Sequence, residues 1–439
     1  MFKETSKELL DFLSKSPTAF HAVENYRQIL NADGFKELLE SEHWDIVPGG
    51  KYYVTRNNTS ILAFKVGTKL DNYSFNIVTS HTDSPTFKVK ENAEIEVKNK
   101  YTQLNTEGYG GMLCATWLDR PLSIAGRVLV SEGNSIVTKL LNIDRDLLMI
   151  PNVAIHMNRA ANDGFKYNLQ VDMLPLLSAG DDRQKDFKQI LADELGVKKE
   201  DILGHDLYLY NRMAPSIWGA NEEFISAGHL DDLQCGFASL KALLAGYNDE
   251  SIDIMACFDN EEVGSGTKQG ADSTLLRDTL TRINSALGKT EEEYYRALAS
   301  SFMLSSDNAH AVHPNHPEHT DATNCTYMNE GVVVKSHAGQ KYTSDGVSMA
   351  VVKALASGAD VPLQYFANRS DKAGGSTLGN IAMAQASMNA VDIGLPQLAM
   401  HSSYETAGIK DTYYAISLMK ALFDSHIQET STHSLEIKR

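Results

Sequence analysis

Residues 252–265, IDIMACFDNEEVGS, join a short apolar run to three acids, Asp259, Glu261 and Glu262. The apolar run is typical of a buried strand that ends in a loop of carboxylates. In open α/β sheets, ligands bind just outside the carboxyl ends of the strands. Of two adjacent acids at such an end, one can bind a metal ion while the other transfers a proton. An isolated pair of glutamates more often lies in a solvated loop. We therefore interpret this pair as functional only if other predicted strands also end in candidate ligands.

This pattern does recur in the rest of the chain. Apolar runs also end at His81, Asp307 and His401, and the helix predicted for residues 226–247 carries Asp231 near its start. We expect these side chains to converge on one edge of one sheet. Two imidazoles and several carboxylates suit a borderline divalent ion such as zinc. They are too many for one tetrahedral ion, whereas two ions ~3.5–4 Å apart that share a carboxylate would use them all.

The distribution of predicted elements divides the chain into two parts. Strands alternate with helices in residues 1–85 and 221–439, which predicts one discontinuous α/β domain with a mostly parallel sheet. Residues 86–220 instead alternate polar and apolar residues, with one helical patch at residues 184–195, QKDFKQILADEL. This change predicts an inserted, mostly β domain. At 439 residues the chain is long enough for both.

Composition argues against several classes of partner. The sequence is 42% hydrophobic and 22% charged, as in a globular protein, and its net charge of -17 argues against binding to nucleic acid or to an anionic membrane. It contains no apolar run long enough to predict a membrane span. The four cysteines are scattered, and the amphipathic first helix lacks the apolar core of a signal peptide. We therefore expect a cytoplasmic protein with reduced thiols.

Five blocks of the sequence resemble a known family. SHTDSP, TWLDRPLSIAGRV, DNEEVGS, SSDNAHAVHPN and PQLAMHS are similar to blocks of the M18 metallo-aminopeptidases, in the aspartyl aminopeptidase group. The similarity runs along nearly the whole chain in the family's order. It implies a three-layer αβα zinc-peptidase domain with an inserted β-rich domain. It also implies hydrolysis of the N-terminal residue of peptides, with a preference for Asp and Glu.

The resemblance implies a role for each candidate ligand. Asp231 would bridge two zinc ions per subunit, which Co²⁺ or Mn²⁺ could replace. His81 and Asp307 would complete the shell of one ion, and Glu262 and His401 the shell of the other. Members of the aspartyl group often have Asn after the bridging aspartate, where this chain has Asp232. We take Asp231 as the bridging residue.

The resemblance also assigns the catalytic pair. Zinc would lower the pKa of a bound water from ~15.7 toward ~7. Glu261 would be the general base that takes the proton of this water and returns it to the leaving amine. Asp83 would orient His81 through the second ring nitrogen, as carboxylates commonly do for metal-binding histidines.

Three further residues are candidates for substrate binding. Lys335 ends an apolar run, where a lysine is more often a surface residue, but the corresponding lysine of the family meets the acidic side chain of the substrate. His156 lies in the predicted insertion, and in the family the matching residue reaches into a neighbouring subunit of a tetrahedral dodecamer. The insertion would then be an oligomerisation domain. His310 falls within a family block and is expected to line the pocket.

A run of histidines in the same region needs separate interpretation. The run places a histidine at every third position, which resembles a metal-binding tract: His310, His313, His316 and His319. Because Pro314 and Pro317 interrupt the run, no helix face can present the rings together. We interpret most of them as ordinary loop histidines and none of them as a ligand.

Rival functions are a neutral-residue aminopeptidase, a related two-metal carboxypeptidase or deacylase, and a non-enzymatic scaffold. Acetylation of the substrate amine would abolish activity in the aminopeptidase case alone. Retention of every ligand and of Glu261 argues against the scaffold.

Overall fold

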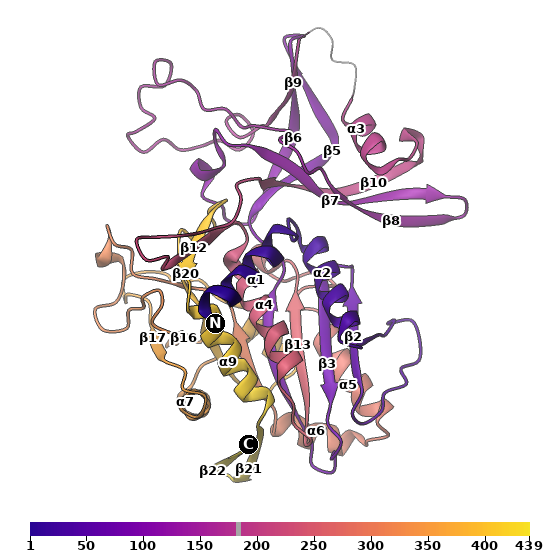
Figure 1. Ribbon diagram of the computed structural model, residues 1–439, viewed down its shortest axis with the longest axis vertical. Helices are drawn as coiled ribbons and strands as arrows, with labels where there is room; N and C mark the ends of the chain where they lie inside the picture. Colours follow the sequence, from indigo (N-terminus) through magenta and orange to yellow (C-terminus); the bar gives the residue numbers. More distant parts are fainter. Residues whose placement is uncertain (181–185) are drawn as a thin grey trace.

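The computed structural model describes residues 1–180 and 186–439, and one large mixed sheet dominates these residues (Figure 1). Its nine strands lie in the order β1 (Lys36–Glu37), β2 (Lys51–Arg56), β3 (Ser60–Val66), β13 (Ser251–Phe258), β4 (Ser74–His81), β14 (Phe302–Ser306), β18 (Asn389–Gly394), β16 (Val332–Lys335) and β17 (Leu363–Phe366). The central strands β13, β4, β14 and β18 are parallel to one another. Antiparallel pairs lie toward the edges, as between β3 and β13. The prediction of a mostly parallel sheet is confirmed.

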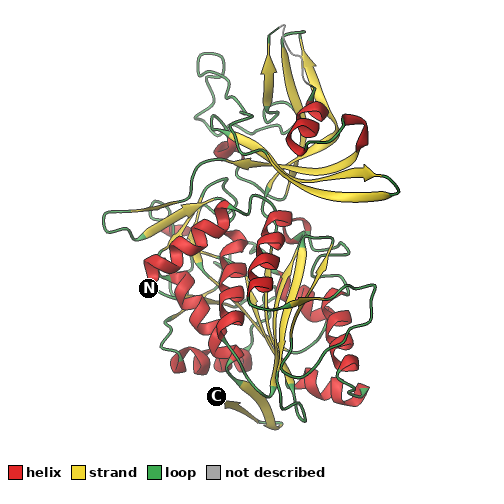
Figure 2. Ribbon diagram, turned by 45° about the vertical axis from the view of Figure 1, so that its right-hand side comes forward, coloured by secondary structure: helices red, strands yellow, loops and turns green. Residues whose placement is uncertain are grey.

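Helices cover both faces of this sheet, which confirms the predicted three layers (Figure 2). One face carries α1 (Phe2–Ser14), α2 (Ala19–Ala32), α4 (Leu230–Ala245), α7 (Gly346–Gly358) and α9 (Asp411–Phe423). The other carries α5 (Leu275–Ala286), α6 (Glu291–Ala299) and α8 (Leu378–Gln385). Because both faces are covered, all eight residues of β13 are buried, which explains why most of them are apolar.

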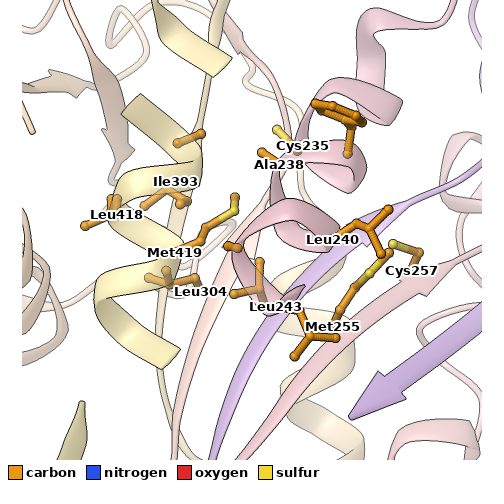
Figure 3. Close-up of a cluster of buried hydrophobic side chains, with 14 of the residues drawn as sticks. Cys235, Ala238, Leu240, Leu243, Met255, Cys257, Leu304, Ile393, Leu418 and Met419 are labelled. Atoms are coloured by element: carbon orange, nitrogen blue, oxygen red, sulfur yellow. The ribbon is translucent and has the colours of Figure 1, made fainter. Parts of the chain in front are cut away.

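The core on the α4 side fixes the position of that helix. Figure 3 shows Leu240 and Leu243 of α4 beside Met255 and Cys257 of β13, with side chains of β14, β18 and α9 completing the cluster. These side chains are fully buried. The first turn of α4, which carries Asp231, is therefore held in place by a rigid core at the end of the sheet.

A second, antiparallel sheet lies above the first in Figure 1. Its order is β8 (Ser135–Asn142), β7 (Leu122–Glu132), β10 (Ile202–Asn211), β5 (Thr86–Val97), β6 (Tyr101–Tyr109) and β9 (Leu176–Ala179). Together with α3 (Phe187–Leu195) it encloses its own hydrophobic core. Helix α3 occupies the predicted helical patch, whose residues 184–185 lie outside the described residues. We propose that this unit is the inserted domain.

A smaller sheet between these two was not predicted. It has the order β11 (Ser216–Trp218), β12 (Phe224–Ala227), β20 (Glu405–Gly408), β19 (Pro396–Leu398) and β15 (Ala309–His310). The chain ends in a hairpin of β21 (His426–Ser431) and β22 (Ser434–Lys438). Within the described ranges, no helix has both the length and the apolar character that a membrane crossing requires.

Candidate metal centre

The predicted residues that follow the parallel strands lie at the same edge of the large sheet. His81 is the last residue of β4, and Asp307 directly follows β14. Glu261 and Glu262 begin a short 3-10 helix, η3 (Glu261–Val263), shortly after β13. Asn260 turns the chain into this helix with a φ of 61°, a left-handed conformation that asparagine tolerates better than most residues. The sheet thus brings an imidazole and three carboxylates together.

The two remaining predicted ligands come from other elements. Asp231 lies in the first turn of α4, where its backbone departs from helical angles. His401 follows β19, which pairs with β15 and β20 rather than with the large sheet. The prediction that all ligand-bearing runs end at one sheet is therefore wrong for His401, because its strand belongs to the five-stranded sheet.

Asp231 lies between the two histidines and presents one carboxylate oxygen to each. Its Oδ1 is 3.5 Å from Nε2 of His81, and its Oδ2 is 3.4 Å from Nε2 of His401. Nε2 of His81 is also 4.0 Å from Oδ1 of Asp307. Nε2 of His401 is 3.4 Å from Oε1 of Glu262. The five predicted ligands therefore form two groups that share Asp231.

This geometry fits zinc. Zinc–ligand bonds of about 2.0–2.1 Å place the ligand atoms of a tetrahedral site about 3.3 Å apart, which is close to the distances above. Three buried carboxylate oxygens find no hydrogen-bond partner within the described chain, namely Asp231 Oδ1, Asp232 Oδ1 and Glu262 Oε1. Buried charges are normally paired or bound to a metal ion. The donor set and the oxygens that lack a hydrogen bond both suit bound cations.

Asp232, which was not predicted as a ligand, lies in the same cluster. His81, Asp232 and Asp307 each offer an atom within 4.8 Å of the others. One oxygen of Asp232 accepts the backbone N–H of His81 at 3.1 Å. Asp231, by contrast, contacts the rings of both histidines. The geometry therefore favours Asp231 as the shared ligand.

Burial controls the protonation of the site's acids. It raises the pKa of Glu261 to about 7 and that of Asp307 to about 6. Burial also acts on Asp231, but the adjacent rings of His81 and His401 outweigh this and lower its pKa. Burial alone would lower the pKa of His401, yet Asp231 and Glu262 raise it to about 10. So many acids in a small volume favour the binding of positive charge.

Asp83 contacts more than the histidine that it was predicted to orient. Nδ1 of His81 is 3.0 Å from the carbonyl oxygen of Asp83 and 3.5 Å from its carboxylate. The carboxylate of Asp83 also accepts the backbone N–H groups of Glu261, at 3.1 Å, and of Glu262, at 3.2 Å. It accepts the hydroxyl of Tyr109 at 2.7 Å as well. Asp83 therefore holds the loop that carries both glutamates.

The six-stranded sheet contributes backbone to the site. Gly110, just after β6, has a φ of 73°, and a Cβ there would lie 3.1 Å from Cβ of Glu262, so a side chain would crowd the site. The carbonyl oxygen of Gly111 is 2.8 Å from Nδ1 of His401. Because a carbonyl can only accept, this contact places the proton on Nδ1 and leaves Nε2 free to bind a metal.

Glu405 is a site residue that sequence analysis missed. Its carboxylate is buried and accepts the backbone N–H of Asp231 at 3.0 Å and that of His401 at 2.8 Å. A single side chain thus holds the backbones of two candidate ligands, Asp231 and His401, that are far apart in the sequence. Such supporting contacts orient ligands and tune metal affinity.

Replacing Glu405 by glutamine should weaken zinc binding by about 10- to 100-fold. Glutamine has one acceptor oxygen, so its amide NH₂ would face one of the two backbone N–H groups. Competition with a chromophoric chelator measures this affinity. Asp411→Asn is the matched control, because Asp411 is equally buried and accepts the N–H groups of Asn329, at 2.7 Å, and Gly331, at 3.2 Å. Equal loss of zinc affinity in both variants would indicate general destabilisation instead.

Lys335 lies beside the cluster as the last residue of β16. Its Nζ is 3.8 Å from Oδ2 of Asp307 and donates to the carbonyl of Asn308 at 2.9 Å. Only 3% of the residue is exposed, so it is not a surface lysine. Burial alone would lower its pKa, but Asp307 and other groups raise it, which keeps the ammonium charged.

The other two predicted residues lie outside the cluster. His310 ends β15 and lines a cavity of about 250 Å³ together with Phe366 and Met400. His156 is exposed on a loop of the insertion. Among the residues described, neither belongs to a group that could hold a metal ion.

Comparison with known proteins gives a consistent result. The family model "Aminopeptidase I zinc metalloprotease (M18)" matches residues 12–423. A "Probable M18 family aminopeptidase 2" of Clostridium novyi (strain NT) is 48% identical over 425 residues, covering 95% of this chain and 98% of that protein. A protein of the same description from Stutzerimonas stutzeri (strain A1501) is 39% identical, covering 97% and 99%.

Solved structures share the fold. A chain of the "Ape4 and Nbr1 complex" has a TM-score of 0.93 at 35% identity, covering 96% of this chain and 86% of that chain. The "S. cerevesiae mApe1 dodecamer" has a TM-score of 0.83 at 28% identity, covering 96% and 97%.

Proposed function

Because the chain belongs to the M18 family of zinc aminopeptidases, we propose that it uses two zinc ions per subunit and prefers acidic N-terminal residues. Because this family consists of aminopeptidases, the carboxypeptidase, deacylase and scaffold alternatives are excluded. The contact of Asp231 with both histidines carries the proposal of two ions.

Each ion would have its own ligands and would share Asp231. His81 and Asp307 would hold one ion, and His401 and Glu262 the other. When bound, zinc supplies a Lewis acid that acidifies water and polarises a carbonyl. Co²⁺ or Mn²⁺ would accept the same nitrogen and oxygen donors.

Glu261 would be the general base of the reaction. Its carboxylate lies within 4.8 Å of ligand atoms of His81 and Glu262. Burial raises its pKa to about 7, which suits a group that accepts and returns a proton near neutral pH. Its backbone is held by Asp83. Glu261 would take the proton of the attacking water and pass it to the leaving amine.

Lys335 supports a preference for acidic residues. It is a buried cation next to the candidate ligand Asp307, in a protein of net charge -17. A desolvated ammonium attracts a carboxylate more strongly than it would in water. The side chain of an N-terminal Asp or Glu would compete for Lys335 with the carbonyl of Asn308.

A rate comparison on Asp-, Glu-, Leu- and Ala-anilides tests this preference. The unaltered protein should favour Asp and Glu, and Lys335→Met should lower the Asp-to-Leu ratio of kcat/KM by roughly thirtyfold, or about 2 kcal/mol. Lys65→Met is the matched control, because Lys65 is also buried but donates to the carbonyls of Leu244, at 3.0 Å, and Gly246, at 2.9 Å. Rates that favour Leu in the unaltered protein would identify a neutral-residue aminopeptidase and remove the role of Lys335.

Self-association into a tetrahedral dodecamer is part of the proposal. The insertion loop around His156 exposes several large apolar side chains, which are Met149, Val153, Ile155, Met157 and Val171. Exposed apolar patches commonly mark interfaces. A related structure is that of the mApe1 dodecamer. On assembly, His156 would enter the active site of a neighbouring subunit.

A cytoplasmic location completes the proposal. All four cysteines lie in the described part of the chain and are free thiols. Free thiols suit a reducing compartment.

A further inference from the structure

The histidine run after β15 forms a row on the surface, contrary to the expectation from its prolines. The ring centroids of His313 and His316 are 5.3 Å apart, and those of His316 and His319 are 5.4 Å apart. Two successive turns produce the row, because the N–H of His316 bonds the carbonyl of His313 at 3.0 Å and that of His319 bonds His316 at 3.2 Å. Side chains three residues apart in such 3-10 turns lie on the same face. Pro317 begins the second turn, η4 (Pro317–His319), rather than separating the rings.

Glu318 lies between two of these rings. Its Oε1 is 3.0 Å from Nδ1 of His316 and 3.9 Å from Nε2 of His319. The three ligand atoms all lie within 4.8 Å of one another. The distances of 3.0 and 3.9 Å lie on either side of the separation of about 3.3 Å between ligand atoms around tetrahedral zinc.

We propose that His316, Glu318 and His319 form a further metal site, for a borderline divalent cation such as Zn²⁺, separate from the candidate metal centre. Two imidazoles and one carboxylate are an established zinc donor set. An ordinary surface ion pair requires one histidine, whereas here two rings approach the same carboxylate oxygen. The side chains are 58–61% exposed, so water would complete the shell of the ion.

The backbone of this turn is held in place before any ion binds. Arg369 donates to the carbonyl of Glu318. The hydroxyl of Thr320 donates to the carbonyl of Pro317 at 2.7 Å, and the proline ring fixes its own φ. Binding an ion therefore costs less backbone conformational entropy here than it would in a flexible loop.

Counting zinc ions tests the site. The full-length, zinc-loaded protein is dialysed against stepwise increasing free Zn²⁺, and zinc per chain is measured by elemental analysis. We expect the double variant His316→Ala, His319→Ala to bind about one ion fewer per chain at saturation than the unaltered protein, since each lost ligand costs at least tenfold in affinity. Glu318→Gln keeps both rings and should weaken the site by about tenfold. Thermal unfolding checks that the variants fold.

His43→Ala is the matched control. His43 is an exposed histidine 3.5 Å from Asp45, and in the described chain this pair belongs to no group of three candidate ligands. Its removal should leave zinc uptake unchanged. Equal zinc uptake by the double variant and the unaltered protein would overturn the site. An unchanged affinity in Glu318→Gln would overturn the three-ligand assignment, and loss of the same ion in His43→Ala would indicate non-specific surface binding.

Discussion

Replacing Glu261 by glutamine is expected to lower kcat by about 10²- to 10⁴-fold while zinc stays bound. Glutamine has nearly the same shape but cannot accept a proton from water. Burial raises the pKa of Glu261 to about 7, so the native carboxyl is able to exchange a proton near neutral pH. Steady-state rates on an Asp-anilide, with zinc content measured on the same sample, give both quantities.

Asp259→Asn is the matched control for this variant. Asp259 lies two residues earlier in the same loop, is also buried, and has a pKa that burial raises to about 7. It belongs to none of the candidate metal groups in the described chain, and one of its oxygens accepts from Gln269 at 3.4 Å. We expect a far smaller loss of rate. Comparable losses in the two variants, or full activity in Glu261→Gln, would contradict the assignment of Glu261 as the base.

The large sheet could be predicted because its strands are long and buried on both sides. The eight residues of β13 and of β4 are all buried, and each strand contains a short apolar segment that precedes candidate ligands in the sequence. The five-stranded sheet escaped prediction because β15, β19 and β11 have only two or three residues. Strands of that length show no readable periodicity. Their pairing is decided by tertiary contacts.

The same distinction separates the predicted from the unpredicted parts of the metal centre. His81 and Asp307 follow strands of the large sheet, so their convergence could be inferred from topology. Glu405 could not be identified, because a lone glutamate is usually exposed and one of its two backbone partners, Asp231, is remote in sequence. Tyr109 was missed for a similar reason, since it reaches Asp83 from the other sheet. Positions that depend on a contact between two sheets leave no local signal.

Replacing Asp231 by asparagine is expected to reduce zinc content from about two ions to below one per chain, with loss of activity. Asp231 presents one oxygen to each histidine, at 3.5 Å from His81 and 3.4 Å from His401. Asparagine keeps a single oxygen and carries no charge, so one ion would face the amide hydrogen atoms and the other would lose an anionic ligand. The change should therefore affect both ions. Elemental analysis after dialysis against metal-free buffer measures the remaining zinc.

Two further variants separate a shared ligand from an ordinary one. The Asp307→Asn variant should bind about one zinc ion fewer per chain, because Asp307 lies near only one of the two histidines, His81. Asp232→Asn tests the neighbouring acid, whose oxygen accepts the N–H of His81 and whose carboxylate lies in the cluster with Asp307. If Asp232→Asn removed both ions and Asp231→Asn removed one, Asp232 would be the shared ligand. If each aspartate variant lost a single ion, the two ions would have separate ligands, and catalysis could not depend on a carboxylate that holds them together.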